Sequence, residues 1–404
     1  MPSYFRLRTG ALASAALTFA LFVTPASSQT LHDFVEAAVS RNPEVGGIAG
    51  RRDAISARQS AAGAWTPGAP TISGSYLTDQ VIRNRRQREA QVGISTPVWL
   101  PGEGTASRRV ADAELSRSHT QSAAIRLKIA GQVRESLADY ALAQAEQSLA
   151  ERRLKDARNL EADVTRRIGA RESSEADLLL ARAERIASDG ELRERILALK
   201  QARLDFESLT GMAPVVAALK ETAPDDTAAQ HPRLDDAKGA MDVARANTSL
   251  ASIQTRDSPE IGIFARNSRD TLGTVYNNSI GVELRIPLAT EGRNAPRKAA
   301  ANAELTEATL GLYATERDVV LEQKKARLAY ENALAQRDLA SDRKATLTRQ
   351  VGLVSRSFQG GQISLFDTIR ARLLAYEADT AASRAEIGVA RARSRLNQAF
   401  GVMP

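Results

Sequence analysis

The sequence repeats itself with a constant offset of 190 residues. The pentapeptide ADAEL at 111–115 recurs as ANAEL at 301–305, and no insertion is needed to extend the match. Further identities at the same offset are Pro97 and Pro287, Gly102 and Gly292, Tyr140 and Tyr330, Asp177 and Asp367, and Gly211 and Gly401. A duplication of this length predicts one structural half that is used twice.

Residues 1–28 have the pattern of a secretory signal peptide. Arg6 and Arg8 precede an apolar run over 11–23, and the small residues at 26–28 suit cleavage after Ser28. A retained membrane anchor is the alternative, but the run is short for a membrane span and Pro25 interrupts it. The chain has no cysteine, so it is neither disulfide-bonded nor a lipoprotein. We expect the mature chain to leave the cytoplasm.

Each predicted repeat contains four parts: a helical lead-in, a strand pair, a long helix and a return helix. The first repeat covers 29–211, with strands at about 70–98 and helices at about 105–167 and 174–209. After a linker at 212–230, the second covers 231–404, with strands at about 260–288 and helices at about 297–358 and 364–400. At 1.5 Å rise per residue, each long helix would extend roughly 90–95 Å, and near-heptad apolar spacing indicates a coiled coil.

The strand segments alternate apolar and polar residues. Val92 and Ile94 alternate with Gln91, and Val282 and Leu284 alternate with Glu283. Four such strands leave unpaired edges that lipid cannot satisfy, and closed membrane barrels need about eight strands or more. The pattern therefore predicts a homo-oligomer whose copies pool their strands, with the apolar faces toward lipid and the polar faces toward water.

The order of these parts, together with two local motifs, resembles the TolC family of outer-membrane efflux proteins. The motifs are SFQGGQISLFD at 357–367, similar to the family's second-half turn, and VELRIPL at 282–288. The resemblance implies a mainly α fold with membrane β-structure: a homotrimer with a 12-stranded β-barrel in the outer membrane and a helical barrel in the periplasm. It also implies a passive exit duct that docks to a periplasmic adaptor (membrane fusion) protein and an inner-membrane RND pump.

The short chain is most similar to the CzcC-type heavy-metal branch of that family, which implies metal cations as cargo. Drugs, organic solvents or a type I secreted protein are the alternatives for a duct. A periplasmic coiled-coil adaptor without a pore is the alternative of another class. The strand pairs favour the duct, since an adaptor has no use for lipid-compatible strands.

The residues offer no chemistry for an enzyme. The three histidines, His32, His119 and His231, are far apart, and without cysteine a soft metal site is close to excluded. No nucleophile–base pattern or phosphate-binding loop is present, and the positive charge is scattered. We therefore expect no catalytic residues, no cofactor, no resident metal and no nucleic-acid partner.

Asp367 and its repeat mate Asp177 are the candidate pore residues. The resemblance implies that acidic side chains just past the helical turns surround the periplasmic aperture, where a carboxylate ring would attract cations. The alternative is an Asp in a first helical turn, stabilised by the helix dipole. Two departures from the family pattern are Arg370, where a second acidic residue is common, and Arg171, which occupies the place of Gly361. Arg171, Glu172, Arg356 or Arg370 could then form the closed-state ion pairs.

Trp65 and Trp99 flank the first strand pair and are candidates for a belt at the interface with outer-membrane lipids. Packing at the helix–strand junction is the alternative. The first hairpin loop carries a basic cluster that either contacts lipopolysaccharide phosphates or is simply solvated, namely Arg83, Arg85, Arg86 and Arg88.

Overall fold

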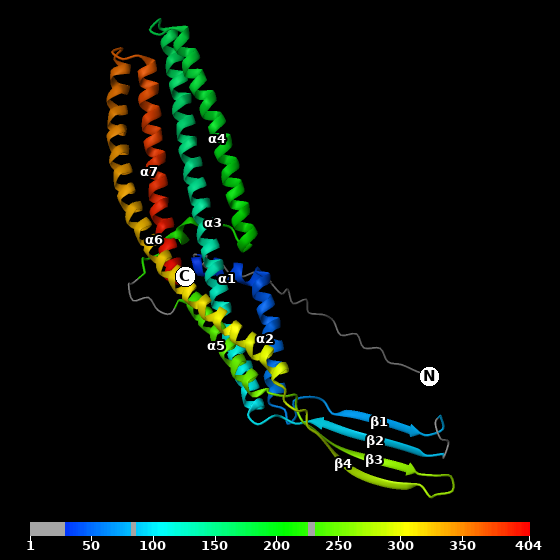
Figure 1. The fold of residues 1–404 in the computed structure, drawn as a ribbon. Coiled ribbons are helices and arrows are strands. Elements are labelled where there is room, and N and C mark those ends of the chain that lie inside the picture. The colour runs from blue at the N-terminus through cyan, green and yellow to red at the C-terminus, as the bar shows by residue number, and fades with distance from the viewer. Residues whose placement is uncertain (1–28, 82–85, 225–230) are drawn as a thin grey trace, which may run out of the picture.

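The computed structural model describes residues 29–81, 86–224 and 231–404. The predicted signal peptide, and Arg83 and Arg85 of the basic loop, lie outside the described residues. The chain is elongated, with a β-sheet at one end and two long helical hairpins at the other (Figure 1). Within the described residues, no helix combines the length and the apolar character that a membrane crossing requires.

The two repeats have the same order of elements. The first contains α1 (Leu31–Arg41), α2 (Pro43–Ala62), β1 (Thr71–Thr78), β2 (Arg88–Pro97), α3 (Glu103–Gly169) and α4 (Glu175–Thr210). The 3-10 helix η1 (Val216–Leu219) follows. The second contains α5 (Pro232–Ile253), β3 (Glu260–Arg269), β4 (Asn277–Arg285), α6 (Glu291–Gln359) and α7 (Leu365–Ala399). This order confirms the predicted fold class of paired hairpins and long helices.

Two boundaries differ from the sequence prediction. We expected the second long helix to start at about 297, after Pro296, but α6 begins at Glu291 and contains that proline in its second turn. A proline so close to a helix start removes only one intrahelical bond. The second strand pair ends at Arg285 rather than at about 288, because Arg285 pairs with Glu260, which is the first residue of β3.

The four strands form one antiparallel sheet in the order β1-β2-β3-β4. The register aligns Ile72, Ile94, Ile263 and Val282 across the sheet. On the opposite face, Ser95, Gly262 and Glu283 are aligned. The apolar and polar faces predicted from alternation therefore continue across both repeats. β1 and β4 have no strand partner on their outer sides in the described chain.

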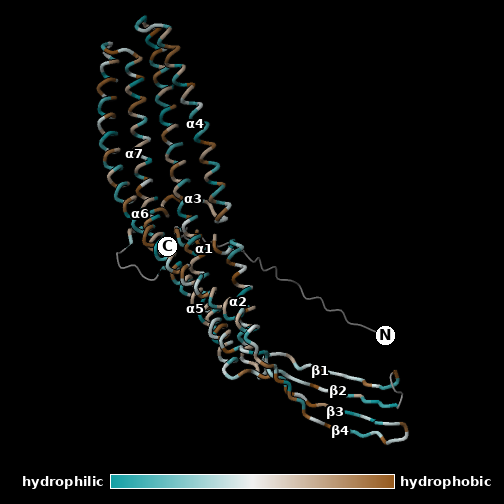
Figure 2. Tube along the Cα trace, in the orientation of Figure 1, coloured by the Kyte–Doolittle hydropathy of each residue, from teal (hydrophilic) through white to brown (hydrophobic). Residues whose placement is uncertain are grey.

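The core lies in two separate clusters along the helices rather than in one globular centre. The larger cluster, at the waist of the molecule, joins α1, the middle of α3 and the end of α4, where the rings of Phe34 and Phe206 meet edge to face at 5.0 Å. The smaller cluster lies near the hairpin turns and includes Val164, Phe358 and Leu365. Hydrophobic residues are accordingly distributed along the whole length of the helices (Figure 2).

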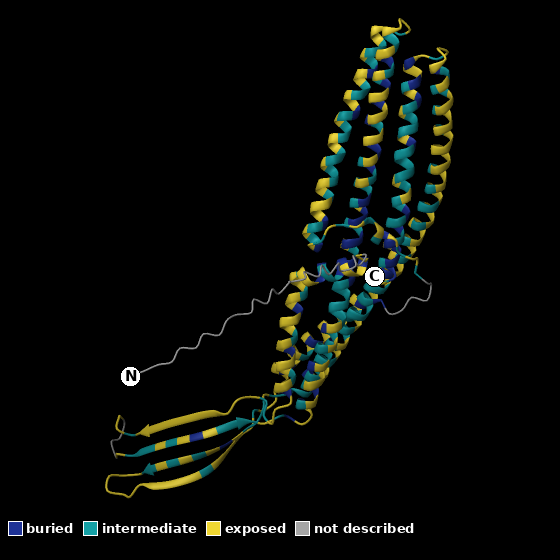
Figure 3. Cartoon of the chain, turned by 180° about the vertical axis from the view of Figure 1, so that it is seen from behind, coloured by how far each residue is buried: buried dark blue, intermediate teal, exposed yellow. Residues whose placement is uncertain are grey.

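The helices form a curved layer with a fixed order of neighbours. Toward the hairpin turns this order is α4, α3, α7 and α6, and toward the sheet it is α2, α3, α5 and α6. α3 therefore has packed neighbours on both sides, whereas α6 stands at one edge of the layer. Figure 3 shows α6 exposed along most of its length.

Candidate functional site

The two helical turns lie side by side at the end of the molecule opposite the sheet (Figure 1). We call the α3–α4 connection the first tip and the α6–α7 connection the second tip. The turns share one backbone geometry. In the first, Arg171 N–H donates to Ile168 and Glu172 N–H donates to Arg167. In the second, Gly361 N–H donates to Phe358 and Gln362 N–H donates to Ser357. Both are Schellman-type helix ends.

The departure at Arg171 changes strain rather than turn type. Arg171 has φ +61° and Gly361 has φ +71°, so both residues occupy the left-handed region. Glycine adopts this conformation without penalty, whereas a side chain makes it unfavourable by about 1–2 kcal/mol. The first tip is therefore strained at the position where the second is relaxed.

Asp177 and Asp367 lie in the first turn of the return helices and take part in helix capping. The N–H of Asp177 donates to the Ser174 hydroxyl at 3.2 Å, and that of Asp367 donates to the Ser364 hydroxyl at 3.1 Å. Each carboxylate in turn accepts from the same serine hydroxyl, at 2.9 and 2.7 Å. Both carboxylates are thus oriented by their own helix start, which is compatible with either role considered for them.

The charges of the two tips are distributed differently. At the first tip, Asp163 pairs with Arg166 at 3.1 Å and with Arg167 at 3.2 Å. The second tip is arginine-rich, and its four arginines form no ion pair within the described parts of the chain: Arg349, Arg356, Arg370 and Arg372. Arg171 and Glu172, also candidates for a latch, have no ionic partner in the described protomer either.

One arginine joins the two tips. The guanidinium of Arg167 lies 4.6 Å from the centre of the Phe358 ring, and its Nη1 donates to the Phe358 carbonyl at 3.4 Å. Below this contact, a groove of about 700 Å³ separates the hairpins. In the groove, Asp379 of α7 bridges Arg152 of α3 at 3.4 Å and Lys344 of α6 at 2.6 Å.

Further from the tips, the seam between α3 and α7 is ionic. Glu146 pairs with Arg384 at 2.6 Å, Asp139 pairs with Arg391, and Glu135 pairs with Arg395 at 2.6 Å. In these three pairs the acidic partner lies on α3 and the basic one on α7, with spacings of seven and then four residues along each helix. Along this seam the two hairpins thus meet through charges, while near the tips they also meet through the smaller core cluster, where Val164 of α3 lies with Phe358 of α6 and Leu365 of α7.

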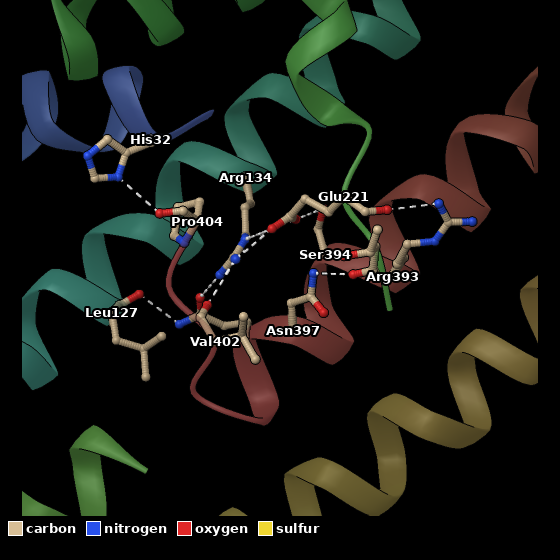
Figure 4. Close-up of polar contacts among 11 residues, drawn as sticks. His32, Leu127, Arg134, Glu221, Arg393, Ser394, Asn397, Val402 and Pro404 are labelled. Carbon is tan, nitrogen blue, oxygen red and sulfur yellow. Dashed lines mark hydrogen bonds and ion pairs between the residues drawn. The ribbon is translucent and has the colours of Figure 1, made fainter. Parts of the chain in front are cut away.

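A buried ion pair at the waist was not predicted from the sequence. Arg134 of α3 is only 2% exposed, and its guanidinium donates to both carboxylate oxygens of Glu221 at 2.7–3.2 Å. It also donates to the Gln398 side chain and to the Val402 carbonyl (Figure 4). The segment at 212–224, predicted as a linker, therefore packs between the two repeats. An arginine between the apolar heptad residues Val133 and Leu137 was the available signal.

Trp65 and Trp99 lie at the same end of the first hairpin, because antiparallel strands bring its two termini together. Trp65 is 98% exposed, whereas the indole N–H of Trp99 donates to the Ala64 carbonyl at 3.0 Å. Both residues lie at the junction of the sheet and the helices, so a belt that contains them would lie at one membrane interface and not at both. Arg86 and Arg88 lie at the other end of the sheet.

The described residues contain no group of three or more His, Asp or Glu side chains that could hold a metal ion. His32 contacts the Pro404 carbonyl at 3.0 Å, His119 contacts Arg52 at 3.2 Å, and His231 caps α5. The three histidines thus remain apart in the fold and have separate structural contacts.

Comparison with known proteins places this fold. The family model described as outer membrane efflux protein matches residues 223–402. No curated protein matches the chain. The solved structure of VceC from Vibrio cholerae is similar with a TM-score of 0.73 at 17% identity, covering 92% of this chain and 96% of VceC.

Two further channels have the same fold. CmeC from Campylobacter jejuni gives a TM-score of 0.73 at 16% identity, covering 92% of this chain and 85% of CmeC. CusC gives 0.74 at 15% identity, covering 93% and 92%. At these identities the likeness shows the fold alone, and the chain has the fold of these three proteins. The residues matched by the family model, 223–402, form almost the whole second repeat.

Proposed function

We propose that three copies of the chain close into a ring and form the exit duct of a tripartite efflux system. The supporting observation is that the sheet and the helical layer both end in unpaired edges, with the first repeat at one edge and the second repeat at the other. β1, α2 and α4 of the first repeat form one edge, while β4 and α6 of the second repeat form the other. A second copy can therefore continue the sheet and the helical layer at once, head to tail, and such a contact generates a ring where the rotation between copies closes.

Exposed leucines on the two edges support this contact. Leu339 of α6 and Leu197 of α4 are both exposed in the protomer, at 65% and 57%. The two leucines also lie at about the same height, because Arg195 pairs with Glu146 near Leu149, the repeat mate of Leu339. In the ring, Leu197 of one copy would pack near Leu339 of the next, which removes apolar surface from water.

Cysteine cross-linking tests the ring directly, because the natural chain has no cysteine to interfere. We expect the full chain carrying Leu197→Cys and Leu339→Cys to give dimers and covalent trimers with a short bis-maleimide in outer-membrane fractions. Each single variant is the matched control and should remain monomeric in denaturing gels. Monomers alone from the double variant would contradict the ring. Recovery of the protein solely from the soluble periplasm would favour the adaptor without a pore.

The acidic tip residues are proposed to narrow the aperture. Asp367→Ala should raise single-channel conductance in planar bilayers, since it removes one carboxylate per copy from the tip. Ser364→Ala is the control for the capping role, because it removes the hydroxyl partner of Asp367 but keeps the charge. Unchanged conductance in Asp367→Ala, or equal changes in both variants, would contradict an aperture role for Asp367.

The partners and the cargo are proposed from the family resemblance. A duct of this type requires a periplasmic adaptor and an inner-membrane RND pump to drive transport, and heavy-metal cations are the cargo to test first. A deletion strain should be challenged in parallel with Zn, Co, Cd, Ni, Cu and Ag salts and with dyes and antibiotics. Sensitivity to organic compounds alone would refute the metal assignment and favour drug or solvent efflux.

Two surface features are proposed to contact the outer membrane. Trp65 and Trp99 would mark its periplasmic interface, where amphipathic rings are favoured. Arg86 and Arg88 would face lipopolysaccharide phosphates at the cell surface. Quenching of the tryptophan fluorescence by interface-restricted lipid quenchers would support the first contact, and weaker lipopolysaccharide binding of an Arg86→Gln/Arg88→Gln double variant would support the second.

A further inference from the structure

The second tip carries an excess of unpaired positive charge at the place where a cation duct would need the opposite. Residues 349–372 contain four arginines and one aspartate, a net charge of +3. The repeat-equivalent residues 159–182 contain four arginines and five carboxylates, a net charge of −1. Both tips lie at the same end of the molecule, so each protomer contributes +2 to that end (Figure 1).

Helix geometry places the positive charge of Arg370 close to the negative charge of Asp367. The two residues are three positions apart on α7, so they share a face and are separated by about 4.5 Å along the helix axis. Any pore that Asp367 lines is therefore also lined by Arg370. In a ring of three copies, the guanidinium groups of Arg370 would lie beside the carboxylates of Asp367 and cancel their attraction for cations.

The remaining arginines are not compensated. Arg349 and Arg356 are exposed and seven positions apart on one face of α6. Arg356 contacts only the Gly352 carbonyl, at 3.3 Å, in the described chain. The carboxylates near these arginines in sequence are few, since Asp367 is the single acidic residue between 349 and 372.

We propose that the aperture of this duct favours anions and repels free metal cations. This inference rests on the proposed pore but departs from the metal cations named above as the first cargo to test: it names anionic or neutral solutes, including metals only as anionic complexes. Field lines from a basic mouth raise the local concentration of anions and lower that of cations. The effect should weaken as salt is added, because the Debye length falls from about 30 Å at 0.01 M to about 3 Å at 1 M.

Reversal potentials in planar bilayers under a KCl gradient test the proposal with the full-length protein. The natural chain should conduct chloride better than potassium, with a permeability ratio that approaches one at high salt. Arg370→Gln should lower the chloride-to-potassium ratio about fivefold at low salt, and Asp367→Asn should raise it about fivefold. This is the effect expected for one charge about 8 Å from the permeating ion in water, because the charge shifts the energies of the two ions in opposite directions. Arg51→Gln, on α2 far from the tips, should leave the ratio unchanged.

The outcomes separate the two levels of the proposal. A preference for potassium over chloride would contradict the proposed anion selectivity but not the proposed pore. Channels in which neither tip variant changes the ratio would also overturn it, because the tip charges would then not face the permeating ions. Absence of any conductance would overturn the pore itself, and the inference with it.

Discussion

The long helices α3 and α6 are equivalent in sequence and of nearly equal length, yet they are packed very differently. α3 has buried side chains along its whole length, from Ala106 to Val164. α6 has only five buried residues, namely Asn294, Ala301, Leu312, Val319 and Phe358. The difference follows from position in the layer, because α3 has neighbours on both sides and α6 has neighbours on one. A duplicated pattern thus specifies helices, while the order of the layer decides which helix is core and which is interface.

The largest expected difference concerns Arg134 and its repeat mate Lys324. Arg134→Met leaves the Glu221 carboxylate buried without its cation and should destabilise the fold by about 3–5 kcal/mol. Lys324 is exposed, so Lys324→Met should change stability by less than about 0.5 kcal/mol. Thermal unfolding followed by far-UV circular dichroism in detergent would measure both. Equal effects would show that the waist ion pair is not a structural centre.

The second comparison uses two leucines of identical type. Leu149 is buried on α3 and its mate Leu339 is 65% exposed on α6. Leu149→Ala should lower the free energy of unfolding by about 2–5 kcal/mol through the cavity that it creates. Leu339→Ala should leave protomer unfolding nearly unchanged but lower the temperature at which the oligomer dissociates in SDS. Gel mobility with and without heating separates these effects, and an unaltered oligomer would remove α6 from the interface.

The third comparison changes the residue at the left-handed position of each tip, by removing the side chain in the first tip and adding one in the second. Arg171→Gly should stabilise the first tip by about 1 kcal/mol, and Gly361→Ala should destabilise the second by a similar amount. Hydrogen exchange of the tip amides would report each change locally. Effects of the same sign in both variants would contradict the equivalence of the two turns.

The smallest expected effect concerns the caps of the lead-in helices. Asn42 caps α2 through its side-chain oxygen, and His231 caps α5 by accepting the Arg233 N–H at Nδ1, at 3.2 Å. Burial, assisted by the nearby Arg233 charge, lowers the pKa of His231 below its usual value of 6.5. Because the folded state disfavours the protonated ring, stability should fall as pH drops below about 6.5 and continue to fall toward the lowered pKa.

His231→Asn should give α5 the same cap residue that α2 has, and should make the stability depend less on pH below about 6.5. Unfolding midpoints measured between pH 5 and 8 in both proteins would show the difference. The control is Asn42→His, which should introduce a similar dependence only to the extent that the new ring is buried. Parallel pH profiles for the natural chain and His231→Asn would exclude His231 as the titrating group.

Most of the secondary structure was predictable because it depends on local patterns. Alternation predicted the faces of β2 and β4, and the long stretches without proline predicted α3 and most of α6. The waist was not predictable in the same way. Glu221 lies in a segment rich in Ala, Pro and Asp with no regular period, and its partner Arg134 is 87 residues away. No local signal specifies such a pair.

The position of the candidate residues next to the helical turns was predictable, but their environment was not. The predicted return helices from about 174 and 364, together with the resemblance of 357–367 to a family turn, placed both turns and the aspartates just past them. The sequence alone did not show that both aspartates are held by their cap serines. Nor did it show that Arg167 reaches across to Phe358, since this contact depends on how the hairpins pack.

The sequence by itself determined the repeat, the two strand hairpins and the long helices, because periodicity and turn residues act over a few positions of the chain. Only the tertiary structure decided that β2 and β3 join the two repeats into one sheet, that 212–224 is clamped at the waist, and that α6 and β4 are left as an open edge. These features depend on which surfaces meet after the chain has folded. Both repeats have the same local pattern, so the pattern cannot specify which of their surfaces become buried and which stay exposed.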